Sequence, residues 1–325
     1  MLYPLIAILL GFVLLVWSAE RFVVGAAEAA RHLGMPPLMI GMVIVGFGTS
    51  APEMVVSASA AWGGNPDLAL GNALGSNIVN TGLVLGLTAL IAPILVQSNI
   101  VRKEIPMLLM ICGLFGLFAL DGALTRTEGI VLLTGFFSLL VWSGISARRT
   151  GTDHLEIEIE QHLAESQMSL KVAFGWLLCG LIMLIVSSKL LVWGAVAIAV
   201  SMGVSNLVIG LTIVALGTSL PELAASVVAA LKGEHDIAIG NVVGSNMFNI
   251  LAVVGIAGVI SPLPQLNPEI LGRDWPVVMG LTLGLWLMAY GHGRQGLLNR
   301  WEGGILLLAF VAYNIVLIRP LLAGI

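Results

Sequence analysis

The chain has 325 residues, of which 58% are hydrophobic and 10% are charged, with a formal net charge of −4. A soluble domain is about half apolar and about a quarter charged. The composition, with a mean hydropathy of +1.03, therefore excludes an ordinary soluble protein and predicts an integral membrane protein. The lipid bilayer is its expected partner, and we expect neither a nucleic-acid partner nor an obligate protein partner.

Runs of about 20 apolar residues, the length of a helix that crosses a bilayer, recur along the chain. They predict an all-α, polytopic fold with about ten transmembrane helices. The expected spans cover residues 2–31, 37–62, 68–93, 104–120, 127–146, 170–200, 206–231, 237–260, 275–290 and 302–319. Loops after odd-numbered spans hold nine Lys and Arg residues, and those on the other side hold three. By the positive-inside rule, both termini of a multi-pass plasma-membrane protein, as in a bacterial inner membrane, are expected outside the cytoplasm.

The chain repeats itself after 169 residues, with 32 identities in the 76 positions from Ser18 to Pro93. The segment Gly48–Glu53 returns as Gly217–Glu222, and Gly71–Asn80 returns as Gly240–Asn249. Five predicted spans separate equivalent positions, so the second copy is expected to cross the membrane in the opposite direction, as in the inverted repeats of secondary transporters. We predict one five-helix repeat at 1–146, an acidic cytoplasmic linker at 147–169 and a second five-helix repeat at 170–325.

Two glutamates stand out because the repeat places both near the middle of a predicted span. Glu53 lies near the centre of the second span, and Glu222 near the centre of the seventh. A carboxylate at that depth costs roughly 2.5–3.5 kcal/mol on insertion scales, so such a residue indicates a functional site. A bound cation or proton would relieve both this cost and the repulsion between the two acids.

Oxygen-bearing side chains accompany both acids. Four pairs spaced four residues apart are expected on shared helix faces: Thr49 with Glu53, Ser76 with Asn80, Thr218 with Glu222, and Ser245 with Asn249. Pro52 and Pro221 lack the N–H that would bond the carbonyls of Gly48 and Gly217, and we expect the freed carbonyls to act as further ligands. Such oxygens suit Ca2+, which takes six to eight of them, better than soft transition metals. No cofactor is expected, and the transported ions are expected to be Ca2+ and Na+, or H+.

These motifs resemble the alpha-repeats of the cation/calcium antiporter superfamily, most closely its prokaryotic sodium/calcium exchanger branch. The resemblance implies a secondary antiporter that exchanges Ca2+ for Na+ by alternating access, with ions bound at the midplane between the repeats. It also implies metal-binding roles for Gly46, Thr49, Ser50, Glu53, Ser76, Asn80, Ala215, Thr218, Ser219, Glu222, Ser245 and Asn249, with Gly46 and Ala215 acting through their carbonyls. Some relatives carry Asp where this chain has Asn249, so the site charge is at most −2, enough for one Ca2+ or two Na+.

Three alternatives stay open on the residues alone. A Ca2+/H+ antiporter is the first, since a proton relieves carboxylate repulsion as a cation does; proton-coupled relatives usually place an acid within the Gly-Asn element, which has none here. A cation channel fits inverted broken helices less well. An intramembrane enzyme would need a His or Lys to activate Ser50 or Ser219, and the motifs contain neither.

Two further expectations concern other polar residues. Glu20 aligns with Lys189 in the repeat, and the two charges are expected either to pair across the first and sixth spans or to reach separately to the interface. Cys112 and Cys179 lie in or near spans without metal-binding spacing, so apolar packing is expected for each.

Overall fold

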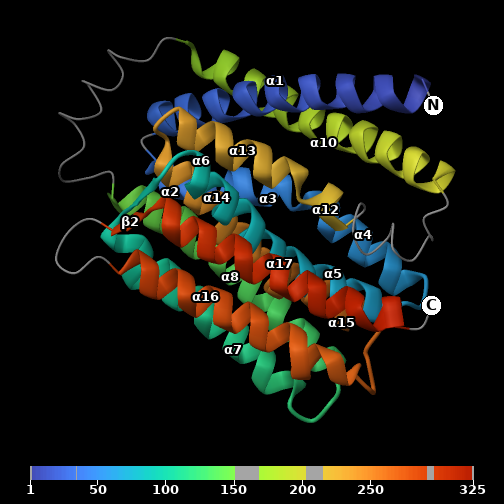
Figure 1. The fold of residues 1–325 in the computed structure, drawn as a ribbon. Helices are drawn as coiled ribbons and strands as arrows, with labels where there is room; N and C mark the ends of the chain where they lie inside the picture. The colour runs from blue at the N-terminus through green and yellow to red at the C-terminus, as the bar shows by residue number, and fades with distance from the viewer. Residues whose placement is uncertain (1, 34, 151–167, 203–214, 291–295, 324–325) are drawn as a thin grey trace. The chain divides into compact units, whose positions relative to one another are not determined.

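The computed structural model describes residues 2–33, 35–150, 168–202, 215–290 and 296–323. These residues are mostly helical, as predicted (Figure 1). The central part of the predicted acidic linker, residues 151–167, lies outside the described residues. The chain divides into two compact units, and each takes segments from both sequence halves: unit 1 is Met1–Glu53 with Gly135–Ser245, and unit 2 is Met54–Thr134 with Asn246–Ile325.

Unit 1 is built from helices of both repeat copies. Its described helices are α1 (Leu2–Leu33), α2 (Pro37–Met39), the π-helix η1 (Ile40–Val45), α3 (Gly46–Thr49), α10 (Leu170–Ser201), α12 (Ala215–Thr218) and α13 (Leu220–Leu231). Three helices run from one unit into the other along the chain: α4 (Ala51–Trp62), α8 (Arg126–Thr150) and α14 (His235–Phe248).

Unit 2 contains the remaining described elements. They are α5 (Pro66–Ile78), η2 (Val79–Leu85), α6 (Gly86–Ile91), β1 (Ile94–Val96), η3 (Ile100–Glu104), α7 (Ile105–Ala119), η5 (Asn249–Val254), α15 (Gly255–Ile260), η6 (Ile270–Asp274), α16 (Trp275–Ala289), β2 (Gly296–Leu298) and α17 (Arg300–Ala323). The three-residue strands β1 and β2 pair antiparallel, an element that the helical prediction missed. This short ladder gives hydrogen-bond partners to backbone groups just beyond the end of α6.

The duplication is visible in the helix boundaries. Helices α3, α4 and α6 begin and end 169 residues before α12, α13 and α15, respectively. The element break between α3 and α4 therefore recurs between α12 and α13. Because boundaries as well as residues repeat, the two copies fold locally in the same way.

Helices α1 and α10, each 32 residues long, pack side by side and antiparallel (Figure 1). Glycines at equivalent positions of the two copies form this contact. A Cβ built on Gly180 would lie 2.6 Å from the Phe22 nitrogen, and one on Gly25 would lie 2.4 Å from the Leu177 nitrogen. The same kind of contact recurs further along the helix pair, where Gly11 lies against Leu191 and Gly194 lies against Ile8. Small residues let the two backbones approach closely. Because α1 and α10 are antiparallel, these equivalent helices of the two copies run in opposite directions.

Unit 2 is held by contacts of the same kind and by two tryptophans. The Trp275 indole donates to the Cys112 carbonyl at 2.9 Å, and the Trp286 indole donates to the Val101 carbonyl at 2.9 Å. Both bonds fasten α16 to the segment formed by η3 and α7. Gly86 lies against Gly303 at a Cβ distance of 3.0 Å to its carbonyl, so α6 and α17 also approach closely.

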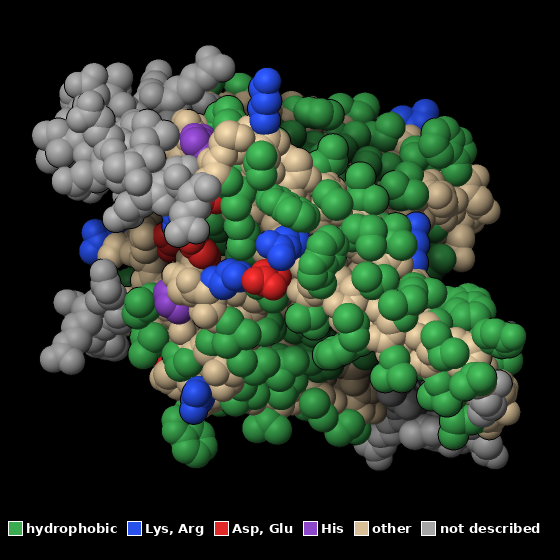
Figure 2. All heavy atoms as spheres, turned by 90° about the horizontal axis from the view of Figure 1, so that it is seen from above, with side chains coloured by type: hydrophobic (Ala, Val, Ile, Leu, Met, Phe, Trp, Pro, Cys, Tyr) green, Lys and Arg blue, Asp and Glu red, His purple; other side chains and the backbone are tan. Residues whose placement is uncertain are grey.

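Five described helical segments are long and apolar enough to cross a membrane. They are Leu2–Leu33, Pro66–Ile91, Leu170–Ser201, His235–Ile260 and Arg300–Leu317. The pair Ile40–Thr49 and Ala51–Trp62, bent by 45°, makes a sixth if counted as one span. The other predicted spans overlap α7, α8, α12 with α13, and α16, so the count of ten stays a prediction. On the face drawn in Figure 2, apolar side chains predominate, as expected of a surface covered by lipid.

The pairing alternative for Glu20 with Lys189 and the expected packing of Cys179 need correction. The carboxylate of Glu20 pairs with Lys232 at 3.1 Å, and no ion pair joins it to Lys189 within the described part of the chain. Because α1 and α10 pack antiparallel, Glu20 and Lys189 do not lie at the same level of the helix pair. They are about 10 Å apart along the helices. Cys112 is buried as expected, whereas Cys179 is exposed and does not pack in the interior.

Candidate cation site

The two glutamates of the repeat meet inside unit 1, at equivalent breaks in two helical segments. Ser50 separates α3 from α4, and Ser219 separates α12 from α13. Glu53 and Glu222 follow in the first turns of α4 and α13, each 1% exposed. The positive end of each helix dipole favours an acidic group there.

Pro52 and Pro221 account for both breaks, since neither can donate to the carbonyl four residues before it. The Gly217 carbonyl, which loses its helical donor to Pro221, accepts a hydrogen bond of 2.7 Å from the Ser188 hydroxyl of α10. The freed carbonyl is thus bonded within the protein. A carbonyl oxygen has a second lone pair, so its role as an ion ligand stays a prediction.

The polar contacts of the acids run between the two repeat copies. The Ser50 hydroxyl donates to the Glu222 carboxylate at 3.4 Å. Thr218, from the second copy, hydrogen-bonds Glu53 of the first. The two carboxyl groups also lie close enough to repel each other electrostatically. The spacing of four predicted a shared helix face for each threonine and the acid that follows it, and the contacts of Thr218 and Ser50 show that the acids also have partners in the other copy.

Buried oxygens without a hydrogen-bond partner in this site favour a bound cation. Within the described ranges, Glu222 Oε2 and the Ser219 hydroxyl have no hydrogen-bond partner although both are buried. A buried polar atom without a partner costs about 1–3 kcal/mol, and more when it is charged. Two repelling carboxylates deepen this cost. A cation among them would remove both penalties, which is the chemistry that this arrangement allows.

Asn241 connects the segments that form this site, although no role was predicted for it from the sequence. It is fully buried on α14 and accepts a hydrogen bond of 3.1 Å from the Thr49 hydroxyl. Its amide nitrogen donates to the Glu222 carbonyl at 3.2 Å and to the Ser226 hydroxyl at 2.9 Å. Asn241 therefore holds α14 against both broken segments. The available signal was the identity of Asn241 with Asn72 in the repeat.

Ser245 lies one turn further along α14, also in unit 1. Its hydroxyl donates to the Gly46 carbonyl at 3.3 Å, and that carbonyl accepts from the Ser50 backbone at 3.0 Å. The Thr49 hydroxyl also donates to it at 3.4 Å, so the carbonyl predicted as a ligand at Gly46 accepts from three donors. Ala215, its equivalent, is the first residue of α12.

The other predicted ligands, Ser76, Asn80 and Asn249, belong to unit 2, where buried amides bond one another. Asn249 donates to the Asn77 side chain at 3.0 Å, and Asn246 donates to the Thr81 hydroxyl at 2.8 Å. Asn80 is 1% exposed and Ser76 is 4% exposed. The side-chain oxygens of Asn80, Asn246 and Asn249 have no partner among the residues described.

Asn77 and Asn246 are repeat equivalents that the prediction omitted. Asn80 and Asn249 lie in the π-helical segments η2 and η5, a distortion frequent at functional sites. Their role as cation ligands, with that of Ser76, stays a prediction from the sequence.

Comparison with known proteins gives a consistent result over nearly the whole chain. The family model described as sodium/calcium exchanger protein matches residues 3–144 and 172–319. A putative antiporter, CaxA of Alkalimonas amylolytica, is 49% identical over 318 residues, which cover 98% of this chain and 99% of the relative. The inner membrane protein YrbG of Escherichia coli strain K12 is 40% identical over 303 residues, 91% of each chain. A solved structure of the sodium-calcium exchanger NCX_Mj, soaked without Na+ and Ca2+, matches with a TM-score of 0.83 and 32% identity, covering 96% of this chain and 98% of that one.

Proposed function

Because the chain belongs to the sodium/calcium exchanger protein family, a family of transporters rather than enzymes, we propose that it is a secondary antiporter that exchanges Ca2+ for Na+. The observation that carries this proposal is the meeting of Glu53 and Glu222 inside unit 1, with hydroxyls that reach from one repeat copy to the acid of the other. The rest of the proposed ligand set in this unit is Gly46, Thr49, Ser50, Ala215, Thr218, Ser219 and Ser245.

Charge explains why one site can exchange the two ions. Two carboxylates supply at most −2, which one Ca2+ or two Na+ ions would balance. If Ca2+ and Na+ occupied the site together, their positive charge would exceed the negative charge of the two carboxylates. The two kinds of ion therefore compete for the same oxygens. Competition at one site is the requirement for antiport, in which a loaded carrier turns over and an empty one does not.

The antiparallel packing of α1 and α10 supports alternating access as the mode of transport. Two copies that run in opposite directions can exchange conformations and so open the site to either side of the membrane. The proposed location is the plasma membrane, with both termini outside the cytoplasm as the distribution of basic residues predicts.

Uptake of 45Ca2+ into liposomes that contain the purified protein tests the coupling ion. An outward Na+ gradient at equal pH should drive uptake, and an outward H+ gradient without Na+ should not. Glu53→Gln and Glu222→Gln should each abolish the Na+-driven uptake. Uptake that follows the pH gradient alone would replace the proposal by Ca2+/H+ antiport.

A further inference from the structure

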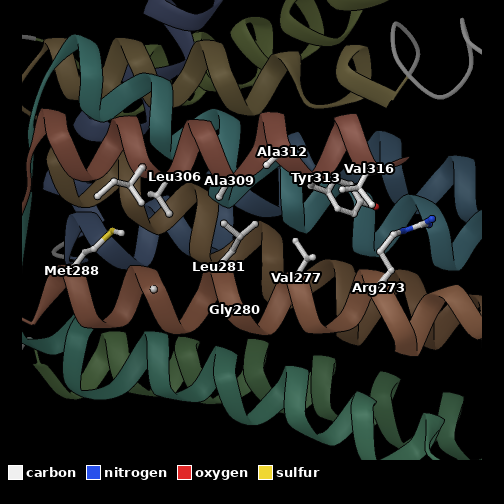
Figure 3. Close-up of a pocket in the computed structure, with 12 residues that line it drawn as sticks. Arg273, Val277, Gly280, Leu281, Met288, Leu306, Ala309, Ala312, Tyr313 and Val316 are labelled. Atoms are coloured by element: carbon white, nitrogen blue, oxygen red, sulfur yellow. The ribbon is translucent and has the colours of Figure 1, made fainter. Parts of the chain in front are cut away.

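A groove of about 490 Å³ lies in unit 2, between the helices α16 and α17 (Figure 3). Its walls are apolar, with Leu281 and Met288 on α16 and Leu306 on α17. Gly280 and Gly284 lie along its floor, and a Cβ added to either glycine would meet nothing within 4 Å. The two helices thus leave an open channel where larger residues would have filled the space.

The groove is long enough to hold an acyl chain. It extends from Met288 on α16 to Arg273 on the preceding η6 (Figure 3), which at a rise of about 1.5 Å per residue is about 22 Å. This exceeds half of the roughly 30 Å hydrocarbon core of a bilayer. An apolar groove of this length beside membrane-spanning helices matches one lipid tail better than a polar solute.

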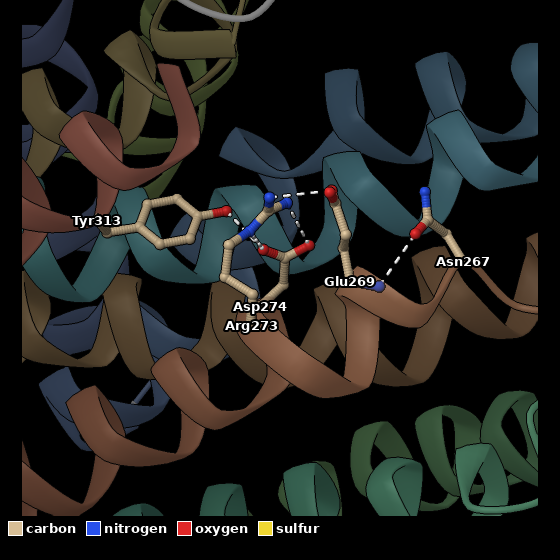
Figure 4. Close-up of polar contacts among 5 residues, drawn as sticks. All are labelled: Asn267, Glu269, Arg273, Asp274 and Tyr313. Atoms are coloured by element: carbon tan, nitrogen blue, oxygen red, sulfur yellow. Dashed lines mark hydrogen bonds and ion pairs between the residues drawn. The ribbon is translucent and has the colours of Figure 1, made fainter. Parts of the chain in front are cut away.

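Charged and polar side chains close one end of the groove (Figure 4). Arg273 pairs with Glu269 at 2.9 Å and with Asp274 at 2.7 Å, and the Tyr313 hydroxyl of α17 donates to Asp274 at 2.9 Å. Asp274 therefore fastens α16 to α17 at this end. The Glu269 side chain is 60% exposed and is open to a ligand.

The charges at this end favour one kind of headgroup. Arg273 has five N–H donors, and its bonds to Glu269 and Asp274 use three of them, which leaves two for a phosphate. Among the residues described at this end, the two acids and one arginine carry a net charge of −1, which attracts an ammonium group and disfavours a lipid with a net negative charge. A headgroup with both a phosphate and a primary amine satisfies both conditions.

We propose that the groove between α16 and α17 binds a single phosphatidylethanolamine. One acyl chain lies along Gly280 and Gly284, the phosphate accepts from Arg273, and the ammonium group donates to Glu269. A choline headgroup has no N–H to donate, and a glycerol headgroup brings no positive charge for Glu269. The structure thus assigns a lipid site by both shape and charge.

Native mass spectrometry of the full-length protein in detergent tests this site. Phosphatidylethanolamine, phosphatidylcholine and phosphatidylglycerol with identical acyl chains are added separately, and the fraction of protein that retains one lipid is measured. Retention of phosphatidylethanolamine should exceed that of the other two about fivefold, the effect expected of charge-assisted hydrogen bonds at a partly exposed site. Equal retention of all three lipids would overturn the headgroup assignment.

Variants separate the tail site from the headgroup site. Gly280→Leu should fill the groove and remove preferential retention, and Ala309→Leu should do the same from the exposed face of α17. Gly113→Leu is the matched control, because Gly113 on α7 also has open space around an added Cβ. Glu269→Gln should lower retention of phosphatidylethanolamine to the level of phosphatidylcholine, whereas Asp67→Asn, at an exposed acid of α5, should not. Unchanged retention in both groove variants would show that the lipid binds elsewhere.

Discussion

Glu53 and Glu222 each lie in the first turn of a helix, 1% exposed, where the helix end offers only part of the compensation that a buried carboxylate requires. Serine and threonine hydroxyls from the opposite repeat copy supply more, but Glu222 Oε2 stays without a partner in the described part of the chain. These two carboxylates therefore favour a bound cation. Their chemistry, oxygen ligands without nitrogen or sulfur, suits Ca2+ and Na+.

Asn241 is expected to act as a positioning residue for this site. Asn241→Leu would remove hydrogen bonds to Thr49 and Glu222, so the Thr49 hydroxyl would donate only to the Val45 and Gly46 carbonyls of its own segment. We expect Ca2+ binding about tenfold weaker, the effect of one buried hydrogen bond of about 1.4 kcal/mol. Isothermal titration of the purified variant with Ca2+ measures this change.

Ser226→Ala is the matched control for Asn241→Leu. It removes one buried partner of Asn241 but leaves the bonds to Thr49 and Glu222. Its Ca2+ affinity should remain within about twofold of the unaltered protein. If both variants lose stability alike and bind Ca2+ with equal, unaltered affinity, Asn241 has only a structural role.

At this scale the residue types could be predicted and their partners could not. The repeat identified Glu53, Glu222 and the hydroxyls beside them. The spacing of four placed Thr49 with Glu53, but the breaks at Ser50 and Ser219 give the acids partners from the other copy. Such contacts join residues more than 160 positions apart, and local periodicity carries no information about them.

Among the elements, the α1–α10 pair shows how small residues set the distance between helices. Gly11, Gly25, Gly180 and Gly194 allow the two backbones to touch, and they occupy equivalent positions of the two copies. The sequence showed these glycines but not their partners. In the antiparallel pair, the contact that each glycine makes is repeated by the equivalent glycine of the other copy.

Gly180→Leu should separate α1 from α10. A Cβ at this position would lie 2.6 Å from the backbone nitrogen of Phe22, and the rest of a leucine has no room. We expect a loss of stability of about 1–3 kcal/mol, the usual cost of overpacking, measured as a lower midpoint of thermal unfolding in detergent. Gly175→Leu, in the same helix with nothing near its added Cβ, should leave the midpoint unchanged. A similar loss in both variants would contradict the close helix contact.

Other features of the elements could not be read from the sequence. The strands β1 and β2 are three residues long, too short for a periodic pattern. The π-helical segments η1, η2 and η5 follow apolar sequence that predicts an ordinary helix. Their boundaries depend on which backbone groups find partners in the folded chain.

Over the whole molecule, the duplication determines more of the fold than any single residue does. Helix boundaries recur after 169 residues, and α1 and α10 pack antiparallel as equivalents of opposite direction. The sequence predicted the helical membrane fold and the duplication, because both depend on composition and on identity at a fixed offset. It did not predict that each compact unit takes segments from both halves, since this division follows from contacts between the copies.

Equilibrium binding of 45Ca2+ to the purified protein, with Na+ as a competitor, tests the central claim that two equivalent glutamates form one exchange site. We predict one Ca2+ per chain, displaced by Na+, and no binding in either Glu53→Gln or Glu222→Gln, while Asp67→Asn binds as the unaltered protein does. The claim would be contradicted if either glutamine variant kept full Ca2+ affinity, or if Na+ left the bound Ca2+ in place.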